Sequence, residues 1–255
     1  MVAFEEEIKR MEPVIRRLSN FALLGKKIVI KGEENFIKSG PNIIVGNHIG
    51  TFKDIATLFK IVPRPFFFTA NNMIFNKEEF NFLIKKHLRR HFKNLAPFLE
   101  LLIIPLKSYI VNYISTNISK VGTIPVDLYQ KKRLAIRTCQ DYLRKGRVFI
   151  ALQGRGRIMK GSLHPYVSSF KGGVSIISYN LFRKEGIKVP VTPIAFFGTH
   201  APFLIPAKIR VNVGKPMYIT DYIEEEFSDV VNRFREAMER RVKDLFAENI
   251  RKGLS

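Results

Sequence analysis

Cysteine is scarce in this sequence, with Cys139 alone among 255 residues. A single cysteine excludes an intramolecular disulfide framework and is compatible with a reducing cytoplasm. Neither this cysteine nor the five histidines show a metal-ligand spacing, so no bound metal is expected.

The sequence also lacks a signal peptide pattern and a membrane-spanning run. Its start, Met1–Glu7, is acidic rather than basic and then apolar. No stretch of about 18 uninterrupted apolar residues occurs, and the nearest approach, Leu95–Ile118, is broken by prolines and polar residues. We therefore expect a cytoplasmic protein that lies peripherally on the inner face of a membrane if it meets one.

Acidic residues are few, 22 against 43 Lys and Arg, and the net charge is +21. Such an excess favours polyanionic partners, either nucleic acid, anionic lipid or phosphorylated ligands. No helix-turn-helix, zinc-finger or RNA-stacking signature accompanies the charge, so nucleic acid is not expected as a partner. The apolar fraction of 46% is enough for a sizeable core.

Apolar residues near the N-terminus recur every three or four positions, which predicts an amphipathic helix. Residues 1–24 are predicted as this helical segment, which Pro13 kinks or divides, and residues 25–255 as the main domain. Packing on the domain and contact with a membrane remain equally open for this helix. The apolar positions are Phe4, Ile8, Met11, Ile15 and Leu18.

The rest of the chain alternates between strand-like and helix-like spacing. This alternation predicts an α/β fold with a mostly parallel mixed sheet flanked by helices. Strands are expected at 28–30, 42–45, 66–68, 123–126, 148–152, 191–197 and 208–213, and helices after residue 48 and at 78–118, 132–143, 173–182 and 224–250.

Residues 78–118 read as a helical insertion with a basic cluster followed by an apolar stripe. Each basic side chain near an anionic leaflet contributes about 1 kcal/mol, and the apolar face could then bury in the interface. An ordinary helical pair with a solvated basic face is the alternative. The cluster consists of Lys85, Lys86, Arg89, Arg90 and Lys93.

A histidine follows the strand at 42–45, and a carboxylate lies six residues further on. His48 would sit at the carboxyl end of a buried strand, where open α/β sheets place ligands. Asp54 could accept the Nδ1 proton and leave Nε2 free to take a proton from a hydroxyl. By spacing alone the pair is weak evidence and favours a structural role, because a His and an Asp within seven residues often occur by chance.

Six short motifs, in order, resemble those of the PlsC-like glycerolipid acyltransferases, over roughly Ile28 to Met217. The first runs from a strand through Gly40-Pro41 to Asn47-His48 and Asp54. The others are Gly122–Asp127, Val148–Arg155, Phe170–Gly173, Val189–Ile194 and Val213–Pro216.

The resemblance implies a glycerol-phosphate acyltransferase-like fold, with His48 as the general base and Asp54 as the residue that orients it. The acyl donor would be acyl-CoA or acyl carrier protein. The acceptor would be a lysophospholipid on an anionic membrane surface, most simply 1-acylglycerol 3-phosphate giving phosphatidate. Gln153, Gly154 and Arg155 would form part of the acceptor site, and no cofactor is expected.

The sequence departs from the family pattern in three places. Five residues rather than four separate His48 from Asp54, Gln153 stands where the family has Glu, and Leu128 stands where it has a phosphate-binding Arg. These changes keep two alternatives open: an acyltransferase for another lipid alcohol, or a catalytically inactive lipid-binding membrane protein. The basic residues expected to compensate at the phosphate are Lys131, Lys132, Arg133, Arg155 and Arg157, with Lys171 of the Phe-Lys-x-Gly stretch counted among the binding residues.

Overall fold

The computed structural model describes residues 3–92, 108, 111–126, 132–154, 156–202, 205–224 and 226–251. The chain groups into two compact units. The first holds Met1–Met11 and Phe67–Ala135, and the second holds Glu12–Phe66 and Ile136–Ser255. The division of the chain expected near residue 24 stays a prediction.

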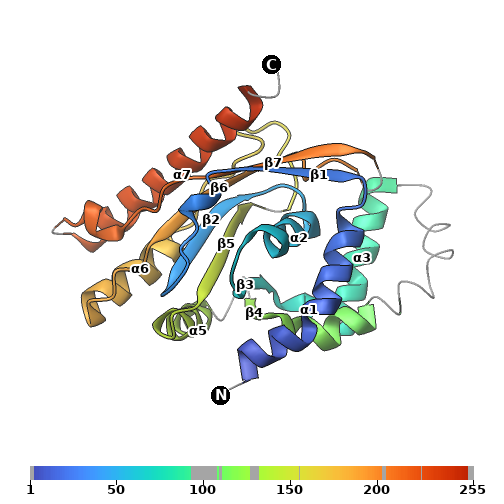
Figure 1. The fold of residues 1–255 in the computed structure, drawn as a ribbon, viewed down its shortest axis with the longest axis horizontal. Coiled ribbons are helices and arrows are strands. Elements are labelled where there is room, and N and C mark those ends of the chain that lie inside the picture. Colours follow the sequence, from blue (N-terminus) through green and yellow to red (C-terminus); the bar gives the residue numbers. More distant parts are fainter. Residues whose placement is uncertain are drawn as a thin grey trace. The chain divides into compact units, whose positions relative to one another are not determined.

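The second unit is built on strands paired in the order β1-β7-β6-β2-β5 (Figure 1). Only the β6–β7 pair is antiparallel, and the other three pairs are parallel. This confirms the mostly parallel, mixed sheet that the sequence predicts. The strands are β1 (Lys26–Lys31), β2 (Asn42–His48), β5 (Val148–Gly154), β6 (Val191–Phe197) and β7 (Ala207–Val213).

The two central strands carry runs of buried apolar residues because both of their faces are covered. Ile43, Ile44 and Val45 of β2 are fully buried, as are Val191 and Ile194 of β6. A strand buried on both faces reads as a continuous apolar run rather than as an alternating one. The core of the second unit therefore lies along β2 and β6.

Helices flank this sheet (Figure 1). The long helix α7 (Phe227–Arg251) packs on β6 and β7 and also contacts α6 (Gly173–Glu185). The apolar stripe that α7 buries recurs at helical spacing, as the sequence predicts. It consists of Val230, Phe234, Met238 and Val242, all fully buried. The short helix α2 (Phe52–Ile61) follows β2 directly.

The first unit contains a second parallel pair, β3 (Phe66–Asn71) with β4 (Thr123–Val126), and the helix α3 (Lys77–Phe92). Helix α3 confirms the first part of the predicted insertion, and residues 111–117 are also helical. Most of the apolar stripe lies outside the described residues. Two helices, α1 (Ala3–Ala22) and α5 (Lys132–Arg144), begin in the first unit and end in the second.

Helix α1 runs through Pro13 as one helix, so the proline does not divide it. Proline at an interior helical position removes one backbone hydrogen bond, which a 20-residue amphipathic helix evidently tolerates here. Within the described part of the chain, no helix is both long and apolar enough to cross a membrane.

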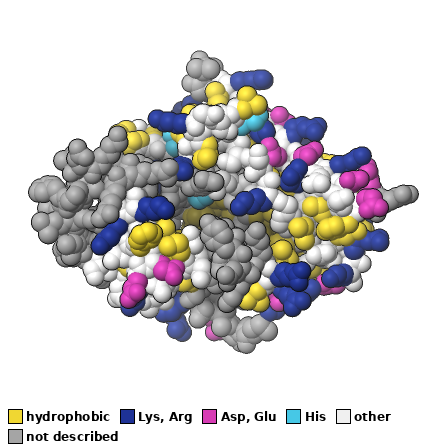
Figure 2. Space-filling model, turned by 180° about the vertical axis from the view of Figure 1, so that it is seen from behind, with side chains coloured by type: hydrophobic (Ala, Val, Ile, Leu, Met, Phe, Trp, Pro, Cys, Tyr) yellow, Lys and Arg dark blue, Asp and Glu magenta, His cyan; other side chains and the backbone are white. Residues whose placement is uncertain are grey.

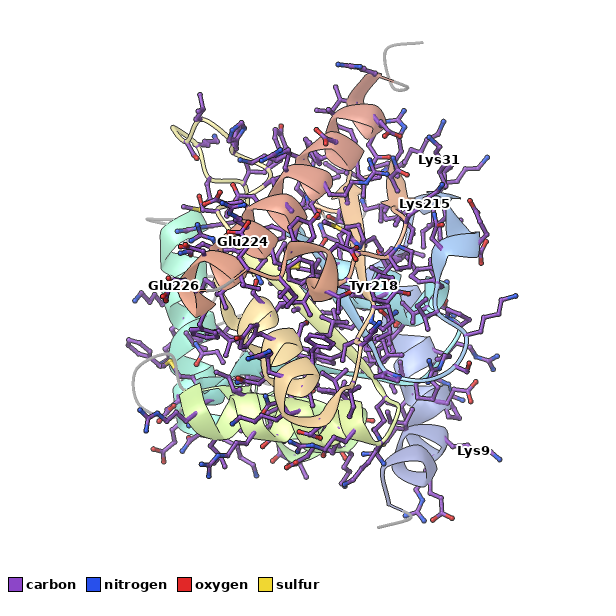
Figure 3. The ribbon with its side chains drawn as sticks, turned by 90° about the vertical axis from the view of Figure 1, so that its left-hand side faces the viewer. Lys9, Lys31, Lys215, Tyr218, Glu224 and Glu226 are labelled. Atoms are coloured by element: carbon purple, nitrogen blue, oxygen red, sulfur yellow. The ribbon has the colours of Figure 1, made fainter. Side chains whose placement is uncertain are left out.

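Strand direction determines which residues share an edge of the sheet in the second unit. Because β2, β5 and β6 are parallel to one another, their carboxyl ends meet at one edge. Strands β7 and β1 run in the opposite direction, so their first residues lie at that same edge. We call it the His48 edge. The other edge carries Lys31, the last residue of β1, and Lys215, two residues after the end of β7 (Figure 3).

Candidate active site

His48 is the last residue of β2 and lies at the His48 edge. The parallel register with β5 places Asn47 opposite Gln153 and His48 opposite Gly154. The histidine motif and the third family-like motif, which are more than 100 residues apart in the chain, therefore meet side by side. This is the juxtaposition that the predicted acceptor site requires.

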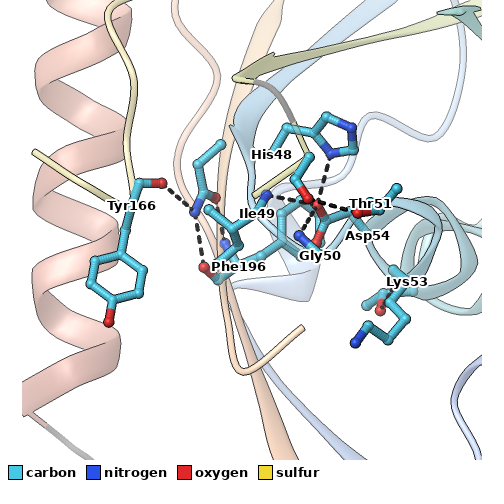
Figure 4. A network of polar contacts seen from close by, with 11 residues as sticks. His48, Ile49, Gly50, Thr51, Lys53, Asp54, Tyr166 and Phe196 are labelled. Atoms are coloured by element: carbon cyan, nitrogen blue, oxygen red, sulfur yellow. Dashed lines mark hydrogen bonds and ion pairs between the residues drawn. The ribbon is translucent and has the colours of Figure 1, made fainter. Parts of the chain in front are cut away.

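Asp54 lies in the first turn of α2, and its carboxylate points back at β2 (Figure 4). Its Oδ2 atom is 2.8 Å from Nδ1 of His48. The same oxygen accepts hydrogen bonds from the backbone N–H of Ile49 at 2.9 Å and of Gly50 at 2.8 Å. The predicted contact between Asp54 and Nδ1 of His48 is confirmed, despite the additional residue between them.

These hydrogen bonds determine which nitrogen of His48 carries a proton. Two backbone N–H groups already donate to Oδ2, so Asp54 meets the ring as an acceptor and Nδ1 is the donor. Nε2 then holds a lone pair. The Asp54 side chain is fully buried, whereas 25% of the His48 side chain is exposed. In the neutral ring, this arrangement leaves the lone pair on Nε2 of a partly exposed side chain, as a general base needs.

A tight turn accommodates the additional residue between His48 and Asp54. The N–H of Lys53 donates to the carbonyl of Gly50 at 3.0 Å, and Thr51 between them has φ 54° and ψ −120°. These are the dihedrals of the first central residue of a type II′ turn, a position that glycine normally occupies. Among the described non-glycine residues, only Thr51 has a positive φ. A β-branched residue in such a region costs about 1–3 kcal/mol.

The Thr51 side chain reaches across to the segment that follows β5. Its hydroxyl donates to the carbonyl of Gly156 at 2.7 Å. Gly156 has φ 69° and lies close to the histidine: a Cβ added there would be 3.2 Å from Nε2 of His48. The sequence analysis missed this contact, because no local pattern links residues 105 positions apart.

The side chain of Asn47, the residue before His48 in β2, also holds the end of this strand in place. Its side-chain N–H groups donate to the carbonyls of Tyr166 at 3.1 Å and Phe196 at 3.0 Å, and its carbonyl accepts from the Phe196 N–H at 2.8 Å. Asn47 is fully buried, so each of these partners replaces lost water. Asn47 therefore ties the end of β2 to β6 and to the segment that contains Tyr166 (Figure 4).

Two lysines bind backbone carbonyls of the connection between β6 and β7. Lys53, only 7% exposed, donates from Nζ to the carbonyl of Ala201. Lys26 donates to the carbonyls of Pro202 and Ile205. Burial lowers the pKa of Lys53, and the nearby charge of Lys26 lowers it further, while Asp54 raises it. The sequence analysis did not identify Lys53 as a buried residue.

The residues predicted to bind the acceptor do not all lie in the same unit as His48, and two of them lie outside the described residues. Gly154 lies opposite His48, and the side-chain carbonyl of Gln153 accepts the backbone N–H of Lys171 at 3.2 Å. Gln153 thereby joins the third motif to the Phe-Lys-x-Gly segment. Arg157 follows Gly156 directly and is partly exposed. Lys132 and Arg133 belong to the first unit, and Lys131 and Arg155 lie outside the described residues. Substrate contacts of all of these residues stay predictions.

Within the described residues, no group of three or more His, Cys, Asp or Glu side chains could hold a metal ion. This finding covers only those residues, and the expectation that the protein binds no metal stays a prediction. The reaction steps considered below are assigned to side chains of this chain.

His200 lies half-buried beside the connection that Lys53 holds. Its ring packs against Tyr166 and Phe197, with ring centroids 5.7 Å and 5.6 Å apart. Burial lowers the pKa of His200, the charge of Lys53 lowers it further, and Asp54 raises it. His200 is thus held in its neutral form over a wider pH range than an exposed histidine.

Comparison with known proteins supports the fold. No protein-family model and no curated protein matches the sequence. Among solved structures, the crystal structure of the 1-acyl-sn-glycerophosphate (LPA) acyltransferase PlsC from Thermotoga maritima matches with a TM-score of 0.51 and 19% sequence identity. The match covers 93% of this chain and 82% of that one. This chain therefore has an α/β fold similar to that of the PlsC structure.

The lowered pKa of His200 predicts a loss of stability in mild acid. The unfolded chain binds a proton near pH 6.5, the ordinary value for histidine, whereas the folded chain does so only at lower pH. The free energy of unfolding should therefore fall as the pH drops below 6.5, with a slope of at most about 1.4 kcal/mol per pH unit from this group.

Urea denaturation between pH 7.5 and 5 measures this slope. His200→Asn should flatten it, whereas His164→Asn, which replaces an exposed histidine, should leave it as in the parent. An unchanged slope in the His200 variant would show that the group titrates alike in the folded and unfolded states.

Proposed function

We propose that this chain is an O-acyltransferase that moves a fatty acyl group from acyl-CoA or acyl carrier protein to the hydroxyl of a lysophospholipid. The simplest such reaction converts 1-acylglycerol 3-phosphate to phosphatidate. The observation that carries the proposal is the His48–Asp54 pair, 2.8 Å apart at the carboxyl end of β2. The fold similarity to a PlsC acyltransferase supports it independently.

The geometry suits a general-base mechanism. Nε2 of His48 takes the proton of the acceptor hydroxyl while the hydroxyl oxygen attacks the thioester carbonyl carbon. The tetrahedral intermediate then collapses, the carbon–sulfur bond breaks, and the thiolate recovers the proton from the imidazolium. Asp54 stabilises the imidazolium throughout, because its carboxylate stays hydrogen-bonded to Nδ1.

The identity of the acceptor depends on the segment after β5. Gln153 keeps an acceptor oxygen where the resembling family has a carboxylate, and this oxygen already binds the backbone N–H of Lys171. The absence of that negative charge favours a second candidate acceptor, a different lipid alcohol. A panel of lysolipids and other lipid alcohols, assayed with both acyl donors, separates the two candidates.

We also propose that the protein works on an anionic membrane surface, with the His48 edge towards the lipid. The end of α1 and the turn between α1 and β1 expose three large apolar side chains close in sequence to Arg16 and Arg17. These are Leu18, Phe21 and Leu24, with exposed fractions of 51%, 63% and 52%. Apolar side chains beside basic ones are what an interfacial segment requires.

The position of this apolar group relative to His48 follows from backbone contacts. The N–H of Ala207 donates to the carbonyl of Gly25 at 3.2 Å, and Lys26 binds the carbonyl of Ile205, whose side chain is also exposed. The same β6–β7 connection binds Lys53, one residue before Asp54. We call Leu18, Phe21, Leu24 and Ile205 the apolar rim. On the face shown in Figure 2, Lys and Arg side chains are spread among acidic ones.

His48→Ala should lower acyl transfer by about 10²- to 10⁴-fold, because that is the usual contribution of a general base. His164→Ala, at an exposed histidine outside the site, is the matched control and should keep the parent rate. Initial rates with purified protein, an acyl donor and lysolipid give the comparison. A His48 variant within threefold of the parent would remove this residue from the mechanism.

Two sets of substitutions separate the apolar rim from the basic cluster of Lys85, Lys86, Arg89, Arg90 and Lys93 in membrane binding. Phe21→Ser with Leu24→Ser should weaken binding to anionic liposomes at every salt concentration, because burial of apolar surface is not screened. Replacing the basic cluster by Gln should weaken it mostly at low salt, since the Debye length shortens from about 10 Å at 0.1 M to about 3 Å at 1 M.

Ile223→Ser is the control for the apolar rim, because this side chain is 41% exposed and does not belong to the rim. Flotation with anionic and with neutral vesicles measures binding. If the apolar-rim variant is folded and binds like the parent, the His48 edge does not face the lipid.

A further inference from the structure

Thr51 occupies a backbone position that glycine would adopt without strain, and the position itself gives no reason for threonine. The turn needs only φ 54° and ψ −120° between Gly50 and Lys53. The residue is exposed, so burial of its methyl group does not explain it either. What threonine adds to the turn is a hydroxyl group.

That hydroxyl binds one particular atom, the carbonyl oxygen of Gly156, at 2.7 Å. Gly156 lies in the segment after β5, beside the imidazole of His48. A Cβ added to Gly156 would lie 3.2 Å from Nε2 of His48, 3.2 Å from Cα of Thr51 and 3.3 Å from its Oγ1. The Gly156 backbone therefore lies against Nε2 and is tied there by Thr51.

We propose that Thr51 is a positioning residue, whose hydroxyl holds the backbone at Gly156 at a fixed distance from Nε2 of His48. We call the Thr51–Gly156 hydrogen bond the latch. The inference rests on the proposed function, because Nε2 is the atom that would take the proton and the segment after β5 carries the groups that would bind the acceptor. The turn that accommodates the additional residue between His48 and Asp54 thus connects the base to the acceptor segment.

The latch matters for rate more than for binding of the donor. Displacement of a reacting group by about 1 Å can cost about 10²-fold in rate, even when every binding group is present. Without the hydroxyl, the acceptor segment would keep its own residues but lose its fixed position relative to Nε2. The kcat should therefore fall while the KM for the acyl donor stays close to that of the parent.

Three substitutions at position 51 separate positioning from turn stability. Thr51→Ser keeps the hydroxyl and should keep kcat within threefold. Thr51→Val keeps the shape but removes the hydroxyl, and should lower kcat about 10- to 100-fold. Thr51→Gly removes the strain together with the hydroxyl, and should lower kcat as much as Val does. A residue needed only for the turn could be replaced by glycine without loss.

A second readout does not depend on acyl transfer. Diethyl pyrocarbonate modifies an unprotonated imidazole nitrogen, and Nδ1 of His48 is engaged by Asp54, so the reaction reports on Nε2. Mass spectrometry of the His48 peptide gives the rate. We expect modification at least threefold faster in the Val and Gly variants than in the parent and the Ser variant, because the segment beside Nε2 is no longer held. Thr220→Val removes a threonine hydroxyl outside the site and is the control.

The outcomes distinguish this inference from the proposed function. If the parent transfers no acyl group but modification rates separate as expected, the latch stands and the proposed reaction is wrong. If the folded Gly variant keeps both kcat and the parent's modification rate, the latch is overturned. The Gly variant keeps this test decisive even if valine prevents folding, because glycine fits the turn.

Discussion

Asp54 lies fully buried in the first turn of α2, where its carboxylate needs hydrogen-bond donors to offset the loss of water. Its Oδ2 atom finds three: the N–H groups of Ile49 and Gly50 and Nδ1 of His48. A hydrogen bond to a charged group contributes about 1.5–3 kcal/mol, and a buried carboxylate that lost these donors would be strongly unfavourable. The chain between β2 and α2 must therefore curl around this one oxygen.

The rest of the site follows from that constraint. Curling the chain within the available residues forces the turn at Thr51 into a conformation that suits glycine, and the hydroxyl of Thr51 then meets Gly156. The register of β2 on β5 brings the same segment to His48 from the side, through Gly154. Two separate parts of the sequence are thus held against one imidazole by a strand pairing and by a side-chain hydrogen bond.

Much of the fold could be predicted from the sequence because its signals are local. Every expected strand is present, and β6 spans the predicted residues 191–197. The contact between His48 and Asp54 was also predictable, since both residues lie within one strand–turn–helix unit. The Thr51–Gly156 contact and the burial of Lys53 were not, because both depend on segments that the sheet brings together over more than 100 residues. The hydrogen bond from the backbone N–H of Lys171 to the Gln153 side chain was missed, although the two residues are only 18 positions apart. Every residue except proline has a backbone N–H, so the sequence does not indicate which of them a side chain will bind.

The central claim is that Asp54 holds His48 in the tautomer whose Nε2 carries the lone pair. The most direct measurement is the ¹⁵N NMR spectrum of the histidine rings at a pH where His48 is neutral, with the His48 signals assigned by their absence in His48→Gln. The account predicts a protonated Nδ1 and an unprotonated Nε2 for His48. A proton on Nε2 instead would contradict it, because the ring could then not accept a proton from an attacking hydroxyl.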